Sequence, residues 1–138
     1  MENPLHRTED RDWLKGTADL PFTVSPSTSY LQLHAFEVGA TWIEFVAWFP
    51  EQNRHVPVKV EFRRDICSRM LGIGGESSQG IGVLRSSAWL NELNELQRKS
   101  YQKFPDNFKD LRHYYFRGHD VTVEVLAEGF LWNEIEQP

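Results

Sequence analysis

The stretch from Tyr30 to Phe49 has the sequence YLQLHAFEVGATWIEFVAWF and predicts a β-hairpin. Glycine at the first central position of a two-residue loop is typical of a type II′ turn, which places the turn at Gly39-Ala40. This turn sets the register of the two strands, with His34 opposite Phe45. The hairpin is the starting point for the rest of the fold.

In that register neither face of the hairpin is polar. One face carries Tyr30, Gln32, His34, Phe36, Ile43, Phe45, Ala47 and Phe49, and the other carries Leu31, Leu33, Ala35, Trp42, Glu44, Val46 and Trp48. An antiparallel sheet commonly exposes one polar face to water. We therefore expect this hairpin to be central in its sheet, with other parts of the protein covering both faces.

The segments that follow predict one more strand and two helices. Residues 56–63 alternate as a strand, with Val58, Val60 and Phe62 pointing inward. A short helix is predicted from Asp65 as N-cap to Leu71, because its apolar residues share one helical face. The main helix is predicted from Ser86 or Ser87 to about residue 104, before Pro105.

A second hairpin is predicted near the C-terminus, with Gly118-His119 as its two-residue loop. Its register places His113 opposite Glu124. The buried face is expected to carry Tyr114, Phe116, Val121, Val123 and Val125. Residues 130–135 are compatible with a further short edge strand.

The order of these elements predicts an α+β fold rather than a parallel sheet with crossover helices. We expect an antiparallel sheet of about five strands in the order β-β-β-α-α-β-β, with one main helix, about 87–104, packed on it. Residues 1–28 are polar and interrupted by prolines, which predicts a loosely ordered N-terminal arm. Residues 29–138 are expected to form a single domain, to which Trp13, Leu14, Leu20 and Phe22 attach the arm.

Charge and composition narrow the classes of function. The formal net charge of −5 argues against a general nucleic-acid binder, which neutralises phosphates with a basic surface. No stretch approaches the ~18 apolar residues of a membrane-spanning helix. The single cysteine, Cys67, forms no disulfide within the chain and fits a reducing compartment. The sequence therefore predicts a soluble, cytoplasmic protein with no membrane association.

The second hairpin supplies the densest set of titratable groups. One of its faces carries His113, Tyr115, Arg117, Asp120, Thr122 and Glu124. A histidine opposite a glutamate is a candidate general acid or base near neutral pH. The alternative, which we favour, is a solvated sheet face on which these residues form cross-strand ion pairs.

Glu44 is a second candidate acid or base, because it lies between Trp42 and Val46 on a largely apolar face. His34 is predicted to lie on the opposite face and therefore not to act together with Glu44. The alternative for both residues is an ordinary structural role.

Two other motifs are weaker candidates for a binding or catalytic site. Residues 72–82 are predicted to be a glycine-rich loop that fits neither the dinucleotide nor the Walker pattern, although its amides remain a hypothetical anion site. Cys67 is predicted to be a buried structural thiol rather than a nucleophile. Neither a cofactor nor a metal site is expected.

Two classes of function follow. The first is a small protein-binding or regulatory module of an acidic bacterial type, resembling immunity-like or adaptor proteins in kind, which binds a partner protein or a second copy. Its binding candidates are Trp42, Trp48 and Tyr115. The alternative is a small enzyme or ligand-binding domain that uses His113, Glu124, Arg117 and Asp120, or a cleft at Glu44. The absence of a recognisable catalytic motif favours the non-enzymatic reading.

Overall fold

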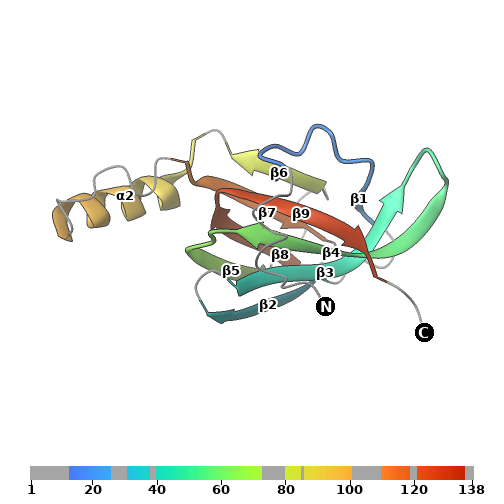
Figure 1. Cartoon of the computed structure of the whole chain (residues 1–138), viewed down its shortest axis with the longest axis horizontal. Coiled ribbons are helices and arrows are strands. Elements are labelled where there is room, and N and C mark those ends of the chain that lie inside the picture. Colours follow the sequence, from blue (N-terminus) through green and yellow to red (C-terminus); the bar gives the residue numbers. More distant parts are fainter. Residues whose placement is uncertain are drawn as a thin grey trace, which may run out of the picture.

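The structure is a computed structural model of the 138-residue chain, and it describes residues 13–25, 31–37, 40–72, 80–84, 86–100, 110–118 and 121–135. The described residues form two antiparallel sheets and one helix (Figure 1). This architecture agrees with the predicted antiparallel, broadly α+β class. The predicted number and order of elements are wrong, since the described chain contains nine strands.

Sheet A is built around β3 (Ala40–Phe49). One side of β3 pairs with β2 (Leu31–Glu37) and, further along, with β1 (Thr23–Val24). The other side pairs with β4 (Arg54–Arg63), which in turn pairs with β9 (Gly129–Glu134). The predicted strand at 56–63 and the C-terminal edge strand are therefore both present.

Sheet B has the strand order β5-β8-β7-β6. These strands are β5 (Cys67–Gly72), β6 (Gly80–Leu84), β7 (Arg112–Arg117) and β8 (Val121–Ala127). The helix α2 (Ala88–Ser100) follows β6. The described chain therefore passes from sheet A to sheet B after β4 and returns to sheet A at β9.

The core lies between the two sheets. Phe116 of sheet B contacts Phe45 and Phe62 of sheet A, with ring centroids 5.9 Å and 5.8 Å apart. Both sheets direct alternate side chains into this layer, as expected for packed antiparallel sheets. Its fully buried members include Ile43, Ala47, Val58, Val60, Tyr114, Phe116, Val123, Val125, Ala127 and Phe130.

The short helix predicted at Asp65–Leu71 is wrong, because this segment forms the corner between the sheets and then β5. Arg64 has a left-handed φ of 51°, which bends the chain after β4. Asp65 is buried, and its carboxylate accepts a hydrogen bond from the hydroxyl of Thr41. The backbone beyond the corner pairs with β8, where Met70 lies opposite Val123. These strand hydrogen bonds override a helical pattern that is only two turns long.

The predicted register of the first hairpin is also wrong. Leu31 rather than Gln32 or His34 shares a face with Phe45, and His34 lies opposite Trp42. Relative to the prediction this is a slip of three residues, with an irregularity between Ala35 and Glu37. An odd slip moves every side chain of β2 to the other face of the sheet. Ala40 pairs with Glu37 inside the ladder, whereas Val38 and Gly39 of the predicted turn lie outside the described residues.

The expectation that both faces of this hairpin are covered is only half right. Sheet B covers the face of Ile43, Phe45, Ala47 and Phe49. Along β3 these buried residues alternate with half-buried residues on the opposite face of the sheet, which are Trp42, Glu44, Val46 and Trp48. No described element covers that second, outer face of sheet A.

The second hairpin also differs from its predicted register, but by an even number. Glu124 lies opposite Tyr115, and His113 lies opposite Leu126. A slip of two residues keeps each side chain on its predicted face. Tyr114 and Phe116 are accordingly in the core, as predicted.

The helix α2 begins where the sequence predicts, since the amide of Leu90 donates a hydrogen bond to the Ser87 hydroxyl at 3.0 Å. It is described as far as Ser100, and residues 101–109 of the predicted segment lie outside the description. The predicted packing of this helix on a sheet is wrong. The helix projects from the two sheets, and among the described strands none packs along its length (Figure 1).

Residues 13–25 of the N-terminal segment lie against the domain. Leu14 and Phe130 exchange two backbone hydrogen bonds of 2.9 Å, and the Tyr114 hydroxyl donates to the carbonyl of Lys15 at 2.9 Å. Gly129 lies so close to this segment that a Cβ atom there would be 3.0 Å from the Leu14 carbonyl oxygen. Phe22 enters the core.

Tyr114 gives the fold a predictable dependence on alkaline pH. Burial raises the pKa of its phenol to about 12, although Arg112 acts in the opposite direction. In the unfolded chain a tyrosine pKa is ~10, so above that pH the unfolded chain releases a proton that the folded protein keeps. We expect the free energy of unfolding to fall by roughly 2 kcal/mol from this group as pH rises from ~10 to ~12.

Urea denaturation at stepped pH measures this effect against Tyr114→Phe. The variant loses the hydrogen bond to Lys15, so it starts about 1 kcal/mol less stable at neutral pH. Its stability should then decline less steeply at alkaline pH than that of the wild type. Parallel declines in the two proteins would contradict the assignment.

Candidate functional site

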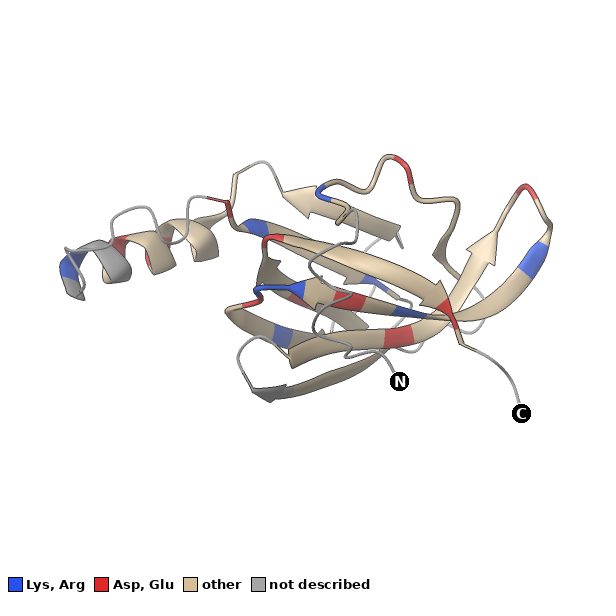
Figure 2. Cartoon of the chain, in the orientation of Figure 1, with Lys and Arg blue, Asp and Glu red and all other residues tan. Residues whose placement is uncertain are grey.

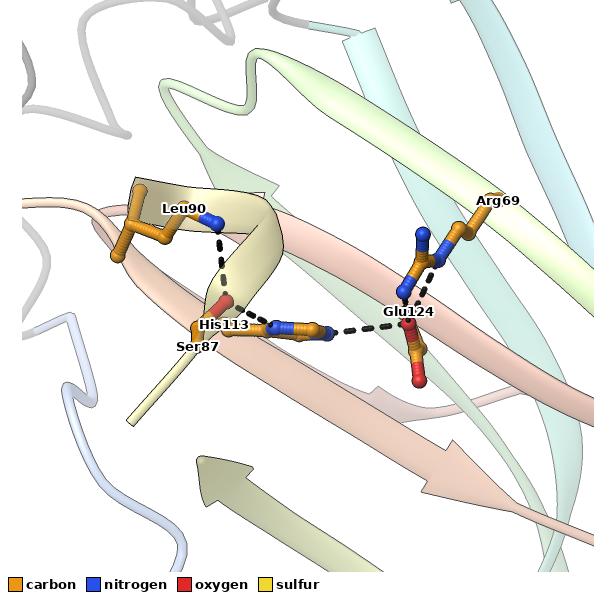
Figure 3. Close-up of polar contacts among 5 residues, drawn as sticks. All are labelled: Arg69, Ser87, Leu90, His113 and Glu124. Atoms are coloured by element: carbon orange, nitrogen blue, oxygen red, sulfur yellow. Dashed lines mark hydrogen bonds and ion pairs between the residues drawn. The ribbon is translucent and has the colours of Figure 1, made fainter. Parts of the chain in front are cut away.

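A buried polar chain crosses the outer face of sheet B, the face turned away from the core (Figure 3). It consists of Ser87, His113, Glu124 and Arg69. Ser87 Oγ lies 2.6 Å from His113 Nδ1, and His113 Nε2 lies 3.1 Å from Glu124 Oε1. Arg69 Nε donates to the same carboxylate oxygen at 2.7 Å. These four side chains therefore connect the start of α2 with strands β7, β8 and β5.

The outer face of sheet B, which carries these four side chains, is not the solvated face expected from the sequence. His113 is 3% exposed and Glu124 is 8% exposed. Trp89 of α2 contacts His113 edge to face, with centroids 5.3 Å apart, and Arg69 lies 4.1 Å from the Trp89 ring centre. His113 and Glu124 thus meet as diagonal neighbours and not as the directly opposite pair that the sequence predicts, and they meet under the first turn of the helix rather than in water.

The charges of the buried polar chain compensate one another. Two guanidinium nitrogens of Arg69 approach one oxygen of Glu124, at 2.7 Å and 2.6 Å. His113 Nε2 is close to that oxygen but lacks the alignment of a hydrogen bond. The Ser87 hydroxyl is shared between His113 and the amide of Leu90. The Ser87 hydroxyl and the Glu124 carboxylate are therefore both engaged within the protein, whereas His113 Nε2 is buried without a hydrogen-bond partner.

The remaining candidates on this hairpin lie apart from the buried polar chain. The Arg117 guanidinium is 4.7 Å from the ring centre of Tyr115. The Tyr115 ring lies across β6, where a Cβ atom on Gly82 would be 2.2 Å from its hydroxyl, so a larger residue there would displace the ring. Asp120 lies outside the described residues.

Glu44 belongs to a second cluster, on the outer face of sheet A. His34 Nε2 lies 2.9 Å from Glu44 Oε2, and the indole Nε1 of Trp42 donates to the same oxygen at 3.0 Å. The imidazole and indole rings stack at 4.8 Å with an interplanar angle of 8°. The prediction that His34 and Glu44 lie on opposite faces is therefore wrong, and the odd register slip is the reason.

The same face continues toward the far end of β3. Lys59 lies 4.8 Å from the Trp42 ring centre and forms an ion pair with Glu61 at 3.2 Å. Trp48 packs on His55, with ring centroids 4.7 Å apart, and the Ser25 hydroxyl lies 2.9 Å from the Nδ1 atom of that histidine. We call this surface the outer aromatic face; it comprises His34, Trp42, Glu44, Val46, Trp48, His55, Pro57, Lys59, Glu61 and Ile135.

The other motifs are located as follows. Cys67 is half-buried in β5, and burial raises the pKa of its thiol. Residues 73–79 of the glycine-rich segment lie outside the described residues, whereas Gly80 and Gly82 belong to β6 rather than to a loop. In the described ranges, no three His, Cys, Asp or Glu side chains gather closely enough to hold a metal ion.

Sequence reasoning missed two partners of the predicted residues. The sequence predicts Ser86 or Ser87 as a helix cap, but the contact of Ser87 with His113 depends on where α2 begins relative to β7. Arg69 was assigned to a short helix, and only its place in β5, opposite Glu124, explains the ion pair. No local sequence pattern signals either contact.

A comparison of the chain with protein-family models, with curated proteins and with solved structures found no match. Within the described part of the chain, no helix has the length and apolar character needed to span a membrane.

Proposed function

We propose that this protein is a small binding module that recognises a protein partner through the outer aromatic face. The observation that carries this proposal is the pair of half-buried tryptophans, Trp42 and Trp48, on the uncovered face of β3. Tryptophan is enriched among the residues that contribute most to protein–protein binding.

The composition of this face resembles that of a protein interface. Its centre is apolar, because Val46 lies opposite Pro57. Ile135 is next to Pro57, since its amide donates a hydrogen bond to the Pro57 carbonyl. Two charged pairs, His34–Glu44 and Lys59–Glu61, lie beside that centre on the side of Trp42. Protein interfaces likewise combine an apolar centre with polar groups next to it.

The tryptophans are held in place before any partner binds. Trp42 is stacked on His34 and hydrogen-bonded to Glu44, and Trp48 packs on His55. Side chains that are already ordered lose less conformational entropy on binding than mobile ones. The carboxylate of Glu44 is engaged by two neighbours in this arrangement, which supports a positioning role more than an acid–base role.

Photo-crosslinking in the producing cells tests the proposal. A photoreactive amino acid at Lys59, on the outer aromatic face, is expected to give adducts with a defined protein, whereas one at Glu51, in the exposed β3–β4 turn, is not. Trp48→Ala is expected to weaken the captured complex by ~30-fold or more, a typical loss for a dominant interface residue. Equal adducts from both positions, or unchanged capture by Trp48→Ala, would argue against it.

A second candidate function is acyl-group hydrolysis at Ser87. The observation in its favour is the sequence of hydroxyl, imidazole and carboxylate in Ser87, His113 and Glu124, which is the order of a nucleophile, its base and the orienting acid. Arg69 competes for the carboxylate, and Ser87 is only 6% exposed, so this arrangement supports catalysis less well than it supports a helix anchor.

Labelling with a fluorophosphonate probe separates the two candidates. A nucleophilic Ser87 would form a covalent adduct that is lost in Ser87→Asp, a change that keeps a good N-cap residue, and in His113→Gln. We expect no adduct on Ser87. A stoichiometric adduct that requires both residues would favour the hydrolase.

A further inference from the structure

The helix α2 carries an apolar stripe that packs on the protein at its start and is exposed at Leu96. Trp89, Leu93 and Leu96 follow the alternating spacing of four and three residues that places side chains along one seam of a helix. Trp89 is used within the chain, against His113 and Arg69. Leu96, by contrast, is 63% exposed, the highest value among the large hydrophobic residues described as exposed.

The charged residues beside this seam are arranged asymmetrically. Glu92 and Lys99 are seven residues apart and therefore lie on the same flank of the seam, one near each end of the helix. Figure 2 shows the acidic residues of α2 ahead of the basic residue at its free end. A parallel neighbour would not bring these opposite charges together, whereas an antiparallel copy would.

We propose that α2 binds the α2 helix of a second copy of this chain, in an antiparallel pair about a two-fold axis near residues 94 and 95. Leu93 of one copy packs against Leu96 of the other, and the two-fold axis repeats this contact. Glu92 of each copy then lies beside Lys99 of the other. This self-complementarity is what a two-fold interface requires, and it is independent of the outer aromatic face.

The position of α2 in the molecule permits this pairing. Ser87 and Trp89 attach the start of the helix to sheet B, and the rest projects from the sheets (Figure 1). In an antiparallel pair the two bodies therefore lie at opposite ends. Two helices of 13 residues form an interface at the low end of the size of specific interfaces, so we expect weak association that depends on protein concentration.

Sedimentation equilibrium of the full chain over a concentration series tests the pairing. The wild type is expected to change from the mass of one chain to twice that mass. Leu96→Glu should remain monomeric, whereas Asn91→Glu, which adds the same residue on the opposite side of the helix, should dimerise like the wild type. A wild type that remains monomeric at every concentration would overturn the proposal.

Charge reversal identifies the orientation of the helices. Glu92→Lys and Lys99→Glu should each weaken dimerisation by roughly 10-fold or more, because each change brings two like-charged pairs together. The double variant should restore the affinity, since the opposite charges meet again with exchanged signs. Far-UV circular dichroism verifies that the helix is retained in each variant. A dimer that persists in Leu96→Glu, or a double variant no tighter than the single ones, would also refute the model.

Discussion

Replacing Phe116 by alanine is expected to lower the free energy of unfolding by about 3–5 kcal/mol, a typical cost for removing a buried aromatic ring. Phe116 is completely buried and contacts Phe45 and Phe62 across the layer between the sheets. Its removal leaves a cavity between the two sheets, because the ring fills the space where residues of both sheets are in contact. Urea denaturation monitored by tryptophan fluorescence measures the loss.

Leu96→Ala is the matched control for Phe116→Ala, because Leu96 is an apolar residue on the exposed side of α2. Its cost should stay within about 0.5 kcal/mol, as for other surface substitutions, when measured at a protein concentration below dimerisation. A loss under 1 kcal/mol for Phe116→Ala would show that the two sheets do not share one core.

Replacing Arg69 by methionine is expected to lower the free energy of unfolding by about 2–3 kcal/mol, less than for a fully buried ion pair. The Glu124 side chain is 11% exposed and would lose the guanidinium that faces it. Arg69 itself is 42% exposed, which reduces the expected cost. Chemical denaturation at neutral pH measures this loss.

The double variant Arg69→Met/Glu124→Gln distinguishes a lost charge partner from lost packing. Removing the carboxylate charge should recover at least half of the stability lost in Arg69→Met. The exposed pair of Arg54 and Glu134, with nitrogen and oxygen 3.1 Å apart, provides a control. Arg54→Met should cost less than about 1 kcal/mol, because both side chains are half-exposed to water. Equal losses at the two sites would contradict the stabilising role of the contact between Arg69 and the buried Glu124.

The candidate clusters show why register limits what a sequence predicts. The second hairpin slipped by two residues, so His113 and Glu124 kept a common face and still meet. The first slipped by three, so His34 and Glu44 meet although the predicted register separates them. The sequence around the first turn does not select one register. Both faces of the hairpin are apolar, so a change of register does not move a polar face into the core.

The short segment after Asp65 illustrates a second limit. Its apolar residues fit a helix, yet it forms β5, since β8 offers backbone partners and the corner at Arg64 directs the chain toward them. Hydrogen bonding to a distant strand carries no signature in six residues of sequence. The contact of Arg69 with Glu124 follows from that pairing and was equally inaccessible.

The stretch from 30 to 49 shows what sequence and tertiary structure each decided. Its alternation determined by itself that β3 would be a central strand with Ile43, Phe45 and Ala47 on a common face. The start of α2 was likewise determined locally to within one residue, with Ser86 or Ser87 as N-cap, because a cap needs only its own next three residues. Only the tertiary structure decided that a second sheet covers one face of β3 and leaves Trp42 and Trp48 on the other, because that outcome depends on contacts between segments remote in sequence.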